Sequence, residues 1–170
     1  MLAYHNDASI KSVILAELAM HRKADELVQG YGYWLDGKGC AVGCTIKSGD
    51  HIEYETRFGI PVTLARLEDC IFEGLPVELA RQWPERFMSS IEPGKDLSLV
   101  SWQFLHWLLT EKSVNPGIDH PLVTDAVKQC ADVIADLAAG KQVDERAASA
   151  AESAAASAAR SAASAARSAA

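Results

Sequence analysis

The sequence predicts a mainly α-helical domain that carries one small β-hairpin and ends in a long alanine-rich helix. Three observations support this fold class. Proline and glycine divide most of the chain into segments whose apolar residues recur at helical spacing. Residues 31–46 depart from that spacing, because aromatic and β-branched residues are interleaved there with glycines. From residue 147 onward, the chain consists almost entirely of alanine, serine and arginine.

The first helix is predicted over about residues 8–28. Asn6 or Asp7 can accept hydrogen bonds from the free N–H groups of its first turn. Gly30 follows its last apolar residues, and a glycine commonly ends a helix.

The β-hairpin is predicted over residues 31–46. A type I′ turn needs positive φ at both central residues, and Asp36 and Gly37 are the dipeptide that such a turn favours. A two-stranded hairpin is marginally stable in water, so Tyr33 and Trp34 are expected to anchor it against the helices.

Short helices are predicted next, because a proline or glycine stands at each of their boundaries. They cover about residues 51–59, 61–74 and 76–91. Pro84 cannot donate a backbone hydrogen bond and clashes with the preceding turn of a helix. Residues 76–91 are therefore expected to form two short helices or one that is kinked at Trp83–Pro84.

Residues 97–112 are predicted to form the central helix of the core, because apolar side chains cover most of its circumference. The side chains expected to be among the most buried are Trp102, Phe104, Leu105 and Leu108. A last helix is predicted from Pro121 to Gly140, with one apolar face.

The predicted domain organisation is a globular domain over residues 1–140 and a tail over residues 141–170. Residues 147–170 contain 15 Ala, 6 Ser, 2 Arg and 1 Glu. Alanine has the highest helix propensity, so the tail is expected to form a helix that acts as a spacer or an association element. The alternative is a frayed, solvated repeat.

Charge and hydropathy exclude several classes of partner. The net charge is −7, and because the tail contributes +1, the first 146 residues carry −8. An acidic body lacks the basic surface that nucleic-acid binding requires, so no nucleic acid is expected. The sequence holds no uncharged apolar run long enough to span a membrane, and its first residues do not resemble a secretory signal. These features, with four cysteines, predict a cytoplasmic protein.

Several strings in the chain resemble a family of uncharacterised bacterial and phage-encoded proteins, whose members commonly end in Ala-Ser-Arg repeats. They are DGKGCAVGC at 36–44, FGIP at 58–61, LARLED at 64–69 and IFEGL at 71–75. The resemblance covers about residues 30–110 and the tail, and it implies a bacterial or phage setting without any assigned reaction or ligand. Related tails often contain tryptophan, which this tail lacks.

Cys40, Cys44 and His51 have side chains that suit zinc. In a strand, the Cα atoms of the two cysteines would lie about 13 Å apart, too far to share one ion. In a helix they would lie about 6 Å apart and could share a metal. The hairpin prediction therefore favours no metal and no cofactor, with these three residues as the alternative metal site.

A cysteine nucleophile is the second functional hypothesis. Cys40 or Cys44 would attack a substrate, with His51, His106 or His120 as general base. Nothing in the sequence places a histidine beside either thiol. His106 stands among aromatic residues and is expected to be a buried structural histidine.

The function that the sequence favours is a small interaction or accessory protein. It would bind a protein partner or self-associate through the tail, and a cysteine-dependent enzyme is the alternative. The carboxylates of Glu68, Asp69 and Glu73 are expected to form a solvated helix face. No motif for phosphate or dinucleotide binding occurs.

Overall fold

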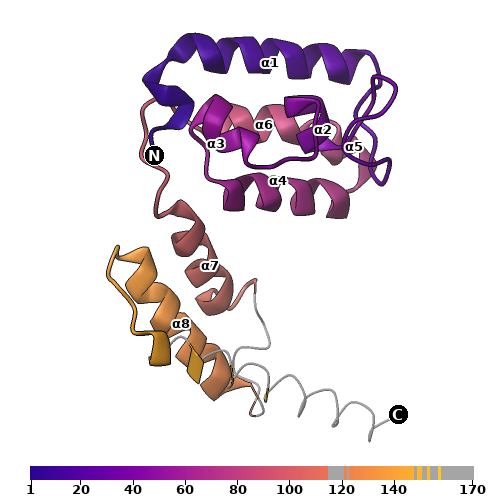
Figure 1. Ribbon diagram of the computed structural model, residues 1–170. Helices are drawn as coiled ribbons and strands as arrows, with labels where there is room; N and C mark the ends of the chain where they lie inside the picture. Colours follow the sequence, from indigo (N-terminus) through magenta and orange to yellow (C-terminus); the bar gives the residue numbers. More distant parts are fainter. Residues whose placement is uncertain (115–120, 122, 148, 151–152, 154–156, 158–170) are drawn as a thin grey trace, which may run out of the picture. The chain divides into compact units, whose positions relative to one another are not determined.

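The computed structural model describes residues 1–114, 121, 123–147, 149–150, 153 and 157. The chain divides into two compact units, Met1–Ser98 and Leu99–Ala170. The helices of the first unit are η1 (Ala3–Asn6, a 3-10 helix), α1 (Ala8–Lys23), α2 (Ala41–Ile46), α3 (Glu53–Phe58), α4 (Val62–Gly74), α5 (Val77–Ala80) and α6 (Trp83–Ser90). Those of the second are α7 (Val100–Thr110) and α8 (Thr124–Ala138). The predicted mainly helical fold is confirmed (Figure 1).

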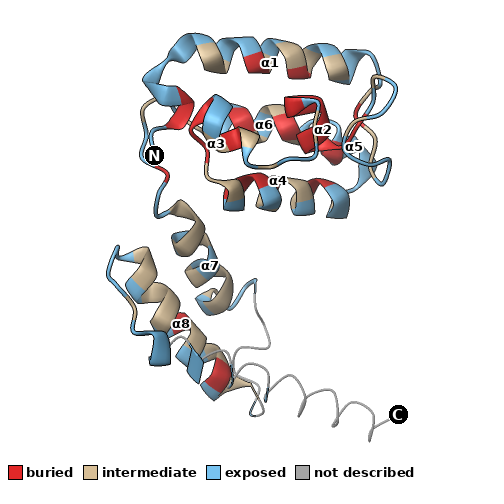
Figure 2. Cartoon of the chain, in the orientation of Figure 1, coloured by how far each residue is buried: buried red, intermediate tan, exposed pale blue. Residues whose placement is uncertain are grey.

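The first unit is built around the short helix α2. Helices α1 and α4 lie on opposite sides of a layer that contains α2, α3 and α6 (Figure 1). Helix α2 contacts α1, α4 and α6, and all of its residues are buried (Figure 2). The residues of this helix are small or apolar and none is charged, so other helices can cover it on every side without burying a charge.

Most helix boundaries of the first unit follow the predicted signals. The Asp7 side chain caps α1 and accepts a backbone N–H of its first turn at 2.8 Å. Gly59 ends α3 with a φ of 61°, and the segment after Gly74 forms two helices, α5 and α6, as predicted. Helix α1 ends at Lys23, earlier than predicted, because Asp25 has a positive φ of 61°.

The predicted β-hairpin over residues 31–46 is wrong, although its turn forms. Asp36 and Gly37 have φ values of 50° and 80°, and Leu35 and Lys38 exchange two backbone hydrogen bonds of 2.8 and 2.9 Å. This is the geometry of a type I′ turn. No strand extends from it on either side.

The chain leaves the turn in a different direction from the predicted strand. The Gly39 backbone bonds to Glu26 and Val28, in the segment that follows α1. Cys40 then caps the first turn of α2. A helix therefore runs through CAVGC, where the sequence analysis expected a strand.

The prediction that α7 is the centre of the core is also wrong. Trp102, Phe104 and Leu108 are only half-buried, Leu105 is 41% exposed, and no residue of α7 is buried. Helix α7 packs against α8, where the buried residues are Ala126 and Ala131. The core of the first unit consists instead of side chains from other helices. Its largest wholly buried hydrophobic members are Tyr4, Tyr54, Phe72, Ile14, Leu18, Ile60 and Met88.

The predicted helix of the alanine-rich tail falls mostly on residues outside the described ones, so it stays a prediction. The predicted domain boundary near Gly140 also stays a prediction. None of the helices in the described part of the chain combines the length and the apolar character that crossing a membrane requires.

Candidate functional site

The structure places Cys40 at the first turn of a buried helix, next to a carboxylate. Its sulfur caps α2 and accepts the Gly43 N–H at 3.5 Å. This position favours a thiolate, but the residue is only 2% exposed. Burial raises the pKa of the Cys40 thiol to about 12, and the negative charge of Asp69 adds to the rise. At neutral pH the thiol is therefore protonated, which argues against a free nucleophile.

Cys44 has a structural role. It is wholly buried, and its thiol donates to the Gly39 carbonyl at 3.5 Å and to the Glu26 carbonyl at 3.6 Å. These contacts tie α2 to the two segments that precede it. Burial, and then the charge of Glu26, raise the pKa of Cys44 to about 12. Cys44 is not in the group of ligand-type atoms around Cys40, and its suggested role as a nucleophile stays a prediction.

Asp69 and Glu73 join Cys40 in a cluster of three ligand-type side chains, which we call the Cys40 cluster. One ligand atom from each lies within 4.8 Å of the other two. The two carboxylates are four residues apart on α4, so successive turns present them on the same side. Helix α2 packs on α4 and brings the sulfur to them. Burial decreases from Cys40, which is buried, through Asp69 to Glu73, which is exposed.

His51 adjoins this cluster through Asp69. Its Nε2 lies 3.7 Å from Asp69 Oδ2, and its Nδ1 lies 3.1 Å from the Gly49 carbonyl oxygen. Because a carbonyl can only accept, Nδ1 carries the proton of that hydrogen bond. The Tyr33 ring packs edge-on against the imidazole, with 5.3 Å between the ring centroids. Nε2 is therefore held facing the carboxylate.

The other two predicted histidines lie outside the first unit. His106 lies on α7, in the second unit, and His120 lies outside the described residues. Residue type pointed to chemistry at Cys40 and His51, whereas Glu68, Asp69 and Glu73 were predicted on a solvated face, which is wrong for Glu68 because it is wholly buried. The spacing of four residues between Asp69 and Glu73 on α4 was the available signal.

A second buried polar group, the pair Tyr54 and Glu68, lies next to the Cys40 cluster along α4. Both residues are 0% exposed, and the Tyr54 hydroxyl donates to Glu68 Oε2 at 2.7 Å. Glu68 Oε1 has no hydrogen-bond partner among the described residues. Burial raises the pKa of Glu68 to about 8, and the neighbouring Asp69 adds to the rise, while the Tyr54 hydrogen bond opposes it. The carboxyl group is therefore mostly protonated at neutral pH.

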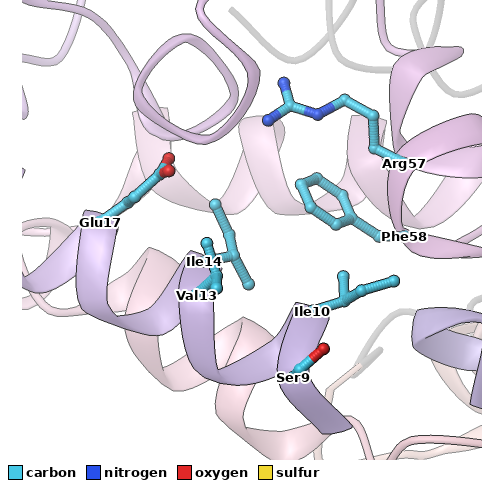
Figure 3. A pocket seen from close by; sticks show the side chains of 7 residues that line it. All are labelled: Ser9, Ile10, Val13, Ile14, Glu17, Arg57 and Phe58. Carbon is cyan, nitrogen blue, oxygen red and sulfur yellow. The ribbon is translucent and has the colours of Figure 1, made fainter. Parts of the chain in front are cut away.

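A groove of about 340 Å³ lies between α1 and α3 (Figure 3). Its lining residues are Ser9, Ile10, Val13, Ile14, Glu17, Arg57 and Phe58. Both charged side chains of the lining have partners: Glu17 pairs with Lys47 at 3.2 Å, and Arg57 donates to the Ile46 carbonyl at 3.0 Å. The groove therefore offers no unpaired charge to a ligand.

In the second unit, helix α7 exposes apolar side chains, whereas the exposed residues of α8 are polar or charged: Asp125, Lys128, Gln129, Asp132 and Asp136. Helix α7 contains no Asp, Glu, Lys or Arg, and Leu105 and Trp107 are 41% and 45% exposed. Two residues apart in a helix, they point to nearly opposite sides. One neighbouring helix cannot cover both of them.

Comparisons of this chain with protein-family models, curated proteins and solved structures found no match. The resemblance of residues 30–110 to uncharacterised bacterial and phage-encoded proteins therefore stays a prediction. Any function proposed for the chain has to rest on its own residues.

Proposed function

We propose that this chain is a small interaction or accessory protein that self-associates through the α7–α8 surface. The observation that supports this function is that α7 is largely apolar, carries no charged side chain and has no buried residue. A cytoplasmic setting and an origin among bacterial or phage-encoded proteins belong to the proposal, and they rest on the sequence alone.

A pair of helices needs a shared core to be stable, since isolated helices are marginal in water. In the second unit, the buried residues of the described helices are Ala126 and Ala131, whose methyl groups offer little apolar area. A second α7–α8 pair would complete a four-helix bundle and cover the exposed flanks of α7.

A second copy of this chain fits the surface better than a charged partner does. In a two-fold symmetric interface the same patch occurs on both sides, so like charges would oppose each other. Helix α7 brings no such charge to the interface, whereas α8 exposes charges at Asp125, Lys128, Asp132 and Asp136, so the proposed contact is centred on α7. The face is two helices wide and about 20 Å long. The accessible surface area that its protruding side chains would bury approaches the ~800 Å² per partner of a standard interface.

Replacement of both Leu105 and Trp107 by Glu is expected to weaken self-association at least ~30-fold, the equivalent of about 2 kcal/mol, because two charges would enter an apolar contact. Sedimentation of the full-length chain over a range of concentrations measures this effect. The matched control is Met20→Glu with Leu35→Glu, which adds the same charge at exposed apolar residues of the first unit.

Three outcomes of the sedimentation experiment decide the proposal. A dimer that the Leu105/Trp107 variant dissociates and the control leaves intact supports it. A wild-type chain that stays monomeric contradicts it. If the Leu105/Trp107 variant stays dimeric and the dimer is lost only when residues 147–170 are deleted, the chain associates through the tail instead, and the proposal is wrong.

A further inference from the structure

The Cys40 cluster combines three kinds of ligand-type group in one place. A thiol, two carboxylates and an adjoining imidazole come from α2, α4 and the loop before α3. Thiolate and imidazole are ligands of zinc and related transition metals, whereas magnesium and calcium prefer oxygen alone. The set Cys40, Asp69, Glu73 and His51 therefore suits a zinc-class cation.

Buried polar atoms without partners point to a missing cation at this place. His51 Nε2 and Asp69 Oδ1 are both buried, and neither has a hydrogen-bond partner among the described residues. With the Nδ1 proton donated to Gly49, the neutral imidazole turns the lone pair of Nε2 toward Asp69 Oδ2. Two acceptors that face each other repel unless a cation or a second proton lies between them.

The surrounding charges also favour a cation. No Lys or Arg in the described ranges lies within 4.0 Å of Asp69 or Glu73. Glu73 is exposed, so one ligand group of the cluster is accessible from solvent.

We propose that Cys40, Asp69 and Glu73, with His51 as the fourth group, bind one zinc ion. In a tetrahedral zinc site with bonds of about 2.0–2.3 Å, ligand atoms lie about 3–4 Å apart. The 3.7 Å between His51 Nε2 and Asp69 Oδ2 meets this requirement for that pair. His51 is not among the three side chains whose ligand atoms all lie within 4.8 Å of one another, so its imidazole would have to move closer to the other two to complete the site. The three atoms within 4.8 Å need to approach by up to about 1 Å. Glu73 is exposed, but its Oε2 accepts the Gly30 N–H at 2.9 Å, so Oε1 would be the ligand atom or that hydrogen bond would break.

Binding would follow the pattern of protein zinc sites. The Cys40 thiol proton leaves to solvent as the sulfur–zinc bond forms. The hydrogen bond from His51 Nδ1 to the Gly49 carbonyl orients the imidazole, as backbone carbonyls do for metal-bound histidines elsewhere.

The test uses Co²⁺ as a probe for zinc on the full-length chain, after dialysis against a chelator. We expect one equivalent of Co²⁺ to give a sulfur-to-cobalt charge-transfer band in the near ultraviolet and tetrahedral bands in the visible range. Zinc should then displace the cobalt, and both the charge-transfer band and the visible bands should disappear. Zinc alone should raise the Tm, because it binds the folded state.

Cys40→Ser is the decisive variant. Serine is a preferred helix N-cap, so the start of α2 is retained while the metal-binding sulfur is lost. We expect loss of the charge-transfer band and a zinc affinity at least ~100-fold lower, since loss of an outer-shell partner alone costs about 10–100-fold. Cys70→Ser is the control, because that thiol is exposed, lies on the same helix as Asp69 and is not in the cluster.

Glu73→Gln provides a second variant, at an exposed position where the fold is not at risk. We expect it to lower zinc affinity at least tenfold with an unchanged circular dichroism spectrum. The proposal is overturned if no stoichiometric cobalt binds, if the band survives in Cys40→Ser, or if Cys70→Ser removes it. Without metal binding, the facing of His51 and Asp69 would be explained by a second proton on the imidazole.

Discussion

Replacement of Gly43 by Ala is expected to be among the most destabilising single changes in the first unit. A Cβ added at Gly43 would lie 1.2 Å from the Tyr33 carbonyl oxygen and 2.2 Å from its carbonyl carbon. Both are backbone atoms, so no rotation of a side chain can relieve the clash. Overpacking usually costs about 1–3 kcal/mol, and a clash with backbone in the central helix should cost ~3 kcal/mol or more. This is a large part of a typical domain stability of about 5–15 kcal/mol.

Gly74→Ala is the matched control for this prediction. Gly74 is the last residue of α4, and a Cβ there meets no atom within 4 Å. Alanine restricts the unfolded chain and favours a helix, so this variant should be more stable by about 0.5–1 kcal/mol. Urea unfolding of both variants measures the difference. Equal stabilities would show that the Tyr33 backbone can move away from α2 at little cost.

The sequence predicted a strand in this segment because the contacts that make it a helix, such as the one at Gly43, lie between distant segments and leave no local pattern. Residues 40–46 alternate small, β-branched and glycine residues, and a short segment that is buried on all sides shows no helical periodicity. Two features distinguish the helix α2 from a strand: the cap by Cys40 and the close approach of the Tyr33 backbone to Gly43. The approach of Tyr33 depends on contacts between segments, which the local sequence does not show. Local signals alone, such as Asp36–Gly37, correctly predicted the turn.

The candidate site shows the same division between local and tertiary information. Residue type raised a metal site at Cys40, Cys44 and His51 only as an alternative, and the helical reading of residues 61–74 placed Asp69 and Glu73 on one face. The sequence could not show that this face meets α2, because that depends on how α4 packs. Likewise, composition predicted α7 as the buried centre of the core, which is wrong, because composition could not show that the first unit has a core without it.

Glu68→Gln is expected to stabilise the first unit at neutral and alkaline pH and to remove most of a pH dependence that the wild type shows. The amide is close in shape to the carboxyl group, and its oxygen can still accept the Tyr54 hydroxyl, which lies 2.7 Å from Glu68 Oε2. The other groups that interact electrostatically with Glu68 are Asp69 and Tyr4. Thermal unfolding between pH 4 and 9 measures the effect, with Glu78→Gln as an exposed control on α5.

The direction of the pH effect follows from proton binding in the two states. The pKa of Glu68 rises from its usual 4.5 to about 8 in the folded chain. Below pH 4.5 both states hold the proton, and the group contributes no difference. Between 4.5 and 8 the folded state holds a proton that the unfolded state has released, so the wild type loses stability as the pH rises. Near pH 7 the loss is on the order of 3 kcal/mol, at about 1.4 kcal/mol for each pH unit.

The glutamine side chain does not titrate, so the profile of Glu68→Gln should be flatter over this window and should lie above the wild-type profile from about pH 6 upward. The two proteins should be nearly equal in stability near pH 4, where Glu68 is protonated in both states of the wild type. Glu78→Gln should run parallel to the wild type throughout. A Glu68→Gln profile parallel to the wild type would contradict the prediction and show that water reaches the Glu68 carboxylate. A loss of stability at every pH would show that the amide NH₂, in the place of Oε1, is the costlier group to bury.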